Sequence, residues 1–223
     1  MWRDTLLMVG KDLRIEARSR VALSQVAPFG VIALVLFAFA LGPDRSPMAK
    51  AAPGLFWVAI LFSSVLAIQR SVSVESVDGA RDGLRLSGLD PAGVFLGKTA
   101  AVAVQLLILE AILGVGVVLL YGARMNSVWL AVVACIAGTI GLAAAGTLYG
   151  ALSAGMRVRE TLLPFLLLPV VAPVLLAGTR IWQAALAGGI PSQGTPWVRL
   201  LIVFDAVYLA LGVVVFGPIQ ESA

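Results

Sequence analysis

Long apolar runs alternate with short charged segments along the chain, and this pattern predicts the fold class. Each run is about 20 residues long, enough for an α-helix to cross a hydrocarbon core about 30 Å thick. The runs are apolar on all sides, whereas a surface helix of a soluble protein keeps a polar face. The pattern predicts six transmembrane helices, over residues 21–41, 53–68, 94–121, 128–154, 161–179 and 198–218.

Composition excludes a soluble protein. Of 223 residues, 60% are hydrophobic and 13% are charged, and the mean hydropathy is +1.00. Soluble domains have about 45–50% apolar and about 25% charged residues. We therefore expect an all-α integral membrane protein, with residues 21–223 forming one transmembrane domain.

The basic residues predict the orientation. If the N-terminus is cytoplasmic, 11 of the 16 Lys and Arg residues fall in cytoplasmic segments and the other five fall outside. This bias indicates a multi-pass protein of the bacterial inner membrane with both termini in the cytoplasm. The net charge of +4 forms no continuous stripe, so no nucleic-acid partner is expected. We also expect no removable signal peptide, because no apolar run before residue 20 precedes a cleavage site.

Residues 1–20 predict an amphipathic helix at the membrane surface. Its apolar residues recur at helical spacing, at Trp2, Leu6, Val9 and Leu13, and charged residues occupy the remaining faces. Such a helix would lie in the cytoplasmic interface and contact membrane lipid. The alternative is a charged N-terminal anchor without a partner.

The cytoplasmic loop at 70–92 has the features of a docking segment. It mixes both charge signs with apolar residues that could seat a short helix on a soluble partner, and its glycines allow close backbone approach. The alternative is an ordinary solvated connector. The candidate coupling residues are Glu75, Asp78, Gly79, Arg81, Gly83, Leu84 and Leu86.

The external segment at 180–197 has only a short apolar stretch followed by glycines and prolines, which favours a re-entrant or lid-like turn over a seventh span. Before it, residues 161–179 contain Pro164, Pro169 and Pro173. Each proline removes a backbone donor, so a bent helix is expected there. Such a bend suits a gate, although kinked helices are also merely structural.

Most catalytic chemistry is excluded. Residues 93–99 resemble a phosphate-binding loop, but the first glycine is one residue too close to Gly97 and no strand precedes it. Histidine is absent, which removes the usual general base and the commonest zinc and haem ligand. The one cysteine, Cys135, lies in an apolar run and is expected to act as a small hydrophobic residue. No metal site is expected, and the chain is expected to be non-catalytic.

Two carboxylates lie within predicted spans. A carboxylate at the depth of Glu110 is costly unless it is paired, protonated or near water. A hydrogen bond that fixes helix packing and a place on a substrate path remain alternatives for Glu110. For Asp205 the favoured interpretation is an ion pair with Arg180 or Arg199. An intramembrane enzyme that uses both carboxylates is disfavoured, because no nucleophile or histidine accompanies them.

The fourth predicted span is rich in glycine, at Gly138, Gly141, Gly146 and Gly150. The last two form a GxxxG spacing, which lets helix backbones touch. Packing within the chain and a dimer interface are both compatible with this spacing.

An ordered set of sequence blocks resembles the haem exporter protein B family (CcmB). It comprises KDLRIEAR at 11–18, GLFWVA at 54–59, Arg70 with Glu75, GLRLSGLDP at 83–91, Gly97 with Lys98, the glycines from Gly138 to Gly146, Arg159 and Glu160 with Pro164, Pro169 and Pro173, and Phe204 with Asp205. The resemblance runs from about residue 8 to the C-terminus.

This resemblance implies the permease subunit of an ABC transporter complex for cytochrome c biogenesis, with an ABC-2 (type V exporter-like) fold. It implies an N-terminal interfacial helix, a cytoplasmic coupling helix and a separate ATPase subunit (CcmA). The further partners implied are CcmC, CcmD and the haem chaperone CcmE. ATP would be bound by CcmA and haem handled by the complex, so no cofactor is expected on this chain.

In that family, ATP hydrolysis frees the haem-loaded chaperone. Since histidine is absent, we expect mechanical coupling rather than haem ligation by this chain. Two ATPase domains need two docking surfaces, so a homodimer within the complex is expected. The alternative is an ABC-2 permease that exports a lipid, a polysaccharide or a drug.

Overall fold

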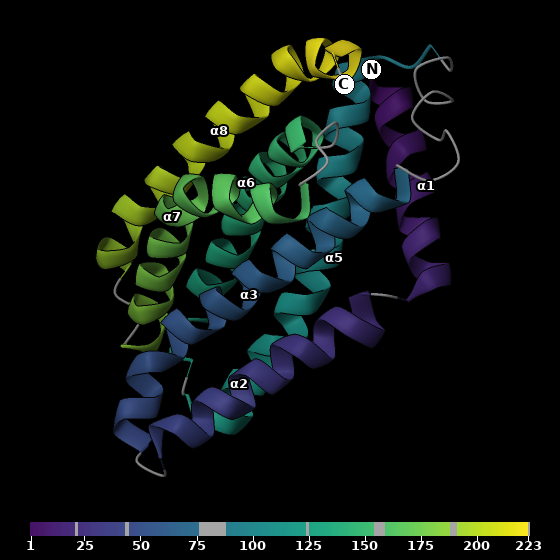
Figure 1. Cartoon of the computed structure of the whole chain (residues 1–223). Coiled ribbons are helices and arrows are strands. Elements are labelled where there is room, and N and C mark those ends of the chain that lie inside the picture. Colours follow the sequence, from purple (N-terminus) through teal and green to yellow (C-terminus); the bar gives the residue numbers. More distant parts are fainter. Residues whose placement is uncertain are drawn as a thin grey trace.

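The computed structural model describes residues 1–20, 22–42, 45–75, 88–123, 125–153, 159–187 and 191–222. Helices make up nearly all of this part of the chain, which confirms the all-α fold class (Figure 1). They are α1 (Trp2–Ser19), the π-helix η1 (Ala22–Val26), α2 (Ala27–Leu41), α3 (Arg45–Glu75), α5 (Pro91–Tyr121), α6 (Val128–Ser153), α7 (Arg159–Leu186) and α8 (Pro191–Ser222).

Six helices in the described ranges are long and apolar enough to cross a membrane, as predicted. Their apolar segments are Ser24–Leu41, Pro47–Ser73, Pro91–Tyr121, Val128–Ser153, Leu162–Leu186 and Gln193–Gln220. On α5, Leu113 is fully buried and Leu119 is 77% exposed, so both sides of the helix are apolar. This distribution is typical of a helix that faces protein on one side and lipid on the other. The chain is therefore a multi-pass membrane protein.

An aromatic cluster lies at the centre of the bundle. The rings of Phe56 on α3 and Trp182 on α7 stack with centroids 3.9 Å apart, and Trp57 meets Phe56 edge-on at 5.7 Å. Trp57 also occupies the space beside two glycines, Gly138 of α6 and Gly178 of α7. These contacts hold α3, α6 and α7 together.

The connection between α7 and α8 is shorter than the sequence predicted. α7 continues through Arg180 to Leu186 and α8 begins at Pro191, so most of the turn expected at 180–197 is helical. The end of α7 is capped by residues from another part of the chain, because the N–H groups of Asn126 and Ser127 both donate to the Ala185 carbonyl at 3.1 Å. The Asn126 side chain donates to the Leu186 carbonyl at 2.7 Å. Tertiary capping therefore extends the helix beyond its apolar run.

The chain changes direction between α1 and α2. Arg20 adopts the left-handed conformation (φ 52°) and its N–H donates to the Glu16 carbonyl at 2.7 Å, which ends α1. η1 then leads into α2. The start of α1 and the end of α8 lie at the same end of the bundle (Figure 1), as an even number of spans requires.

Candidate functional site

α1 is seated on the first turns of α5 at two glycines. A Cβ atom at Gly93 would lie 2.9 Å from the Met1 carbonyl oxygen. One turn later, a Cβ atom at Gly97 would lie 2.8 Å from the Thr5 carbonyl oxygen and closer still to Met8 Cβ. Only glycine lets two helix backbones approach this closely. The first turns of α1 and α5 therefore run side by side (Figure 1).

Polar contacts hold the same end of α1. Asp4 Oδ2 accepts a hydrogen bond from the Asp90 N–H at 3.3 Å and another from the Met1 ammonium at 3.2 Å. Asp90 Oδ1 accepts from the Ala92 N–H at 3.1 Å and so caps α5. The ammonium hydrogen bond, with help from the Asp90 N–H, lowers the pKa of Asp4 below its ordinary value. Asp4 is therefore anionic at neutral pH and links the starts of both helices.

Met8 anchors α1 in the body of the protein, where it is 1% exposed. It belongs to an apolar cluster drawn from α1, α5, α6 and α8, with Val94, Phe95, Ala144, Leu148, Phe216 and Ile219. The ring of Phe95 lies 5.5 Å from that of Phe216. The start of α1 thus packs on α5 and shares an apolar cluster with α6 and α8. We call its contact region with α5 the α1 seat (Asp4, Thr5, Met8, Asp90, Gly93 and Gly97).

The apolar face predicted for α1 does not form the seat. Trp2 and Leu6 are 73% and 70% exposed, whereas the buried positions are Thr5 and Met8. At 100° per residue, the stripe of Trp2, Leu6, Val9 and Leu13 is displaced from the packing face. Trp2 and Leu6 are therefore exposed and could enter the membrane interface, whereas Val9 and Leu13 of the same stripe are partly buried.

The seat is not evident from the sequence, where Gly93 and Gly97 stand in a segment that resembles a phosphate-binding loop and Gly97 also belongs to a family block. Their spacing is GxxxG, the same as that of Gly146 and Gly150. That spacing was the available signal. It does not name the partner helix, which the structure identifies as α1.

The predicted coupling residues adjoin the seat in sequence. Glu75 is the last residue of α3, and its side chain is not among those that the structure describes. Asp78, Gly79, Arg81, Gly83, Leu84 and Leu86 lie outside the described residues. The next described residue is Gly88, and two residues later Asp90 contacts α1. The predicted coupling residues, which end at Leu86, are therefore only a few residues from Asp90 of the seat.

Glu110 forms a buried polar contact between α5 and α6. It is 3% exposed, and Thr139 Oγ1 donates a hydrogen bond to its Oε1 at 2.6 Å. Oε2 has no hydrogen-bond partner among the described residues. Of the two alternatives, this arrangement supports the helix-packing role.

Asp205 is not paired with an arginine, so that prediction is wrong for the described structure. Arg180 instead donates to Gln183 at 3.2 Å. Arg199 is six residues from Asp205, about 240° around α8, and is exposed while Asp205 is 8% exposed. Asp205 Oδ1 packs on α6, where a Cβ atom at Gly141 would lie 2.7 Å away, and it lacks a partner within the described ranges.

The glycines of α6 receive side chains from other helices of the same chain. Gly138 receives Trp57, Gly141 receives Phe204 and Asp205, Gly146 receives Ile68, and Gly150 receives Ile68 and Val72. Packing within the chain therefore accounts for this spacing.

The family-motif residues map to α7. Arg159 and Glu160 begin the helix, although their side chains are outside the description, and Pro164, Pro169 and Pro173 lie within it. No group of three or more His, Cys, Asp or Glu residues that could hold a metal comes together in the described part of the chain.

Comparison with protein families decides the identification. The model of the CcmB protein family matches residues 3–218, nearly the whole chain. The chain belongs to the CcmB protein family. This membership confirms the resemblance seen in the ordered sequence blocks.

Curated relatives of this CcmB-family chain carry the name heme exporter protein B. The relative from Haemophilus influenzae is 28% identical over 222 residues, which cover 98% of this chain and 95% of the relative. That from Pseudomonas aeruginosa is 28% identical over 215 residues, covering 95% and 92%. That from Escherichia coli K12 is 34% identical over 90 residues, covering 40% and 41%.

Proposed function

We propose that this chain is the membrane permease subunit of an ABC transporter complex for cytochrome c biogenesis. In this proposal a separate ATPase subunit, CcmA, binds and hydrolyses ATP. The chain couples that hydrolysis to haem delivery and to release of the haem-loaded chaperone CcmE, with CcmC and CcmD as membrane partners. Membership of the CcmB family and the name of its relatives support the haem assignment.

The α1 seat is the observation that carries the coupling mechanism. Asp90 lies near the end of the predicted coupling loop (70–92), caps α5 and donates its N–H to Asp4 of α1. A displacement of this segment would therefore act on α1 and α5 together. Met8 belongs to an apolar cluster that also contains side chains of α6 and α8, and α5 packs on both of those helices, so a displacement of α1 and α5 would be transmitted to them.

The chain's own role in this proposal is mechanical. It has no histidine to ligate haem iron, and its buried carboxylate Glu110 already bonds to Thr139. Haem is then the cargo of the complex rather than a cofactor of this subunit. Two copies of the chain would present two docking surfaces to a pair of ATPase domains. Both termini would lie in the cytoplasm of a bacterium.

Co-purification with the neighbouring ATPase tests the proposal. The tagged wild-type chain should capture the ATPase from mild detergent, and Leu84→Asp with Leu86→Asp should abolish capture. Gln193→Asp is the matched control. Gln193 is exposed near the start of α8, and the two chain termini lie together at the opposite end of that helix (Figure 1). Failure of the wild type to capture any ATPase would refute the transporter assignment.

The cargo needs a second measurement. We expect haem-loaded chaperone to change the ATPase rate of the captured complex and haem-free chaperone to leave it unchanged. Stimulation by a lipid, a polysaccharide or a drug, with no response to the chaperone, would instead establish a permease for another substrate.

A further inference from the structure

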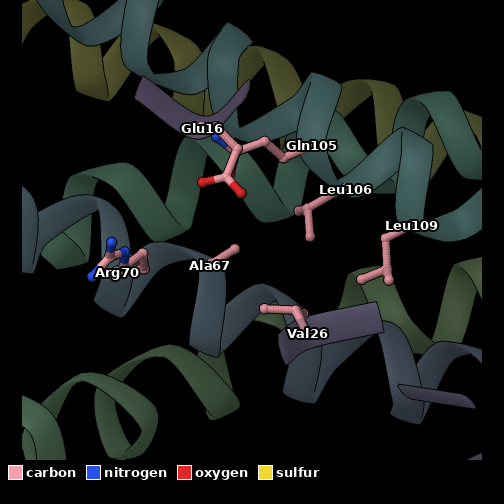
Figure 2. A pocket seen from close by; sticks show the side chains of 7 residues that line it. All are labelled: Glu16, Val26, Ala67, Arg70, Gln105, Leu106 and Leu109. Carbon is pink, nitrogen blue, oxygen red and sulfur yellow. The ribbon is translucent and has the colours of Figure 1, made fainter. Parts of the chain in front are cut away.

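A groove opens where α1 departs from α5. It lies between the end of α1, η1, α3 and α5, and Figure 2 shows lining side chains from all four elements around one space, with Arg70 at its edge. Its lining has a polar part, here called the mouth, of Glu16, Arg70 and Gln105, and an apolar part, here called the floor, of Val26, Leu106 and Leu109. Charged and apolar groups therefore meet in one site, next to the helix predicted to lie in the membrane interface.

Two polar groups of the mouth have no protein partner in the described structure. The Arg70 guanidinium, at the exposed end of the α3 span, makes no hydrogen bond or ion pair there, and only the Arg70 carbonyl accepts a bond, from Ser73. The half-buried Gln105 amide also makes none within those residues, although it interrupts an apolar stretch of α5. Polar groups beside lipid are costly unless they are hydrogen-bonded, so both are suited to a ligand that supplies acceptors.

The shape of the groove limits the ligand. Counted out to its open mouth, it holds about 320 Å³, at the lower end of the range for small-molecule sites. A volume of this size suits part of one aliphatic chain along the floor.

We propose that this groove binds one glycerophospholipid whose headgroup carries a primary ammonium, such as phosphatidylethanolamine. The Arg70 guanidinium and the Gln105 amide donate to the phosphate, and an acyl chain follows Leu106 and Leu109. Glu16 has another interaction partner, but a carboxylate has about four acceptor sites and retains capacity for the ammonium. Its negative charge disfavours a headgroup that is anionic overall. The inference is independent of the transported cargo.

Native mass spectrometry of the purified, delipidated chain tests the inference. Phosphatidylethanolamine, phosphatidylglycerol and phosphatidylcholine are offered at equal concentration. We expect one molecule of phosphatidylethanolamine to bind, with about tenfold preference, because charge-assisted hydrogen bonds are the strong ones. Equal binding of phosphatidylglycerol, or no selective binding, would overturn the inference.

Variants locate the bound lipid. Arg70→Gln with Gln105→Leu should weaken phosphatidylethanolamine binding about tenfold, while Arg180→Gln should leave it unchanged. Arg180 is the matched control because it is an exposed arginine on α7 that does not line the groove. Each variant is first compared with wild type by thermal unfolding in the same detergent. Retained selectivity in a folded double variant would also overturn the inference.

Discussion

Replacing Gly97 with alanine should loosen α1 from α5. The new methyl group would lie 2.8 Å from the Thr5 carbonyl oxygen and closer to Met8 Cβ, which no relaxed structure permits. Overpacking of this kind costs about 1–3 kcal/mol, and the better helix propensity of alanine returns about 1 kcal/mol. The net loss is up to about 2 kcal/mol, so the detached population of α1 should rise up to about 30-fold.

Thiol labelling in reconstituted membranes measures this detachment. In a Cys135→Ala background, which removes the one native cysteine, Thr5→Cys reports the seat because Thr5 is 8% exposed. Labelling should be slow with Gly97 intact and up to about 30-fold faster with Gly97→Ala. Gly10→Ala is the control, because nothing lies within 4 Å of a Cβ atom at Gly10. Equal labelling rates in both variants would refute the seat.

Three further perturbations probe the rest of the structure. Thr139→Val should destabilise the protein by about 1–3 kcal/mol in a denaturation assay, because it leaves Glu110 buried without its donor; an unchanged midpoint would contradict this. Gly146→Ala should lower the thermal midpoint because its Cβ would overlap Ile68, whereas Gly54→Ala, with nothing within 4 Å, should not; equal midpoints would show that α6 packs differently. The depressed pKa of Asp4 predicts that its contribution to stability is present above the unfolded pKa and lost as pH falls through the folded pKa. Acid should therefore lower the thermal midpoint less in Asp4→Asn than in wild type, and an equal shift in both would contradict this.

The spans were predictable because lipid imposes one simple requirement. A helix such as α5 must be apolar on its buried side at Leu113 and on its exposed side at Leu119, so hydropathy alone locates it. The helix ends were not predictable. α7 continues to Leu186 because the turn at Asn126 and Ser127 caps its last carbonyl groups. That contact joins residues about 60 positions apart, and no local pattern reports it.

The candidate site was only partly predictable for a similar reason. The spacing of Trp2 and Leu6 predicts an amphipathic helix, but it marks the face turned away from the protein. The packing face uses Thr5 and Met8, which do not stand out as a stripe. The prediction that Asp205 pairs with Arg199 was wrong because residues that are close in sequence on α8 need not lie on the same face of the helix.

A disulfide across the seat would test most directly whether α1 and α5 move as one unit. A Cβ atom at Gly93 would lie 3.0 Å from Asp4 Cβ, close to the range of about 3.5–4.5 Å in native disulfides. Asp4→Cys with Gly93→Cys, in the Cys135→Ala background, should therefore form a bond on oxidation. Because a Cβ atom at Gly93 also lies 2.9 Å from the Met1 carbonyl oxygen, the oxidised protein is compared with the reduced form of the same variant. We expect the oxidised complex to retain its chaperone-dependent ATPase activity, since the bond joins parts that do not separate. Loss of activity on oxidation, restored by a reductant, would show that α1 must leave α5 and would contradict the proposed coupling.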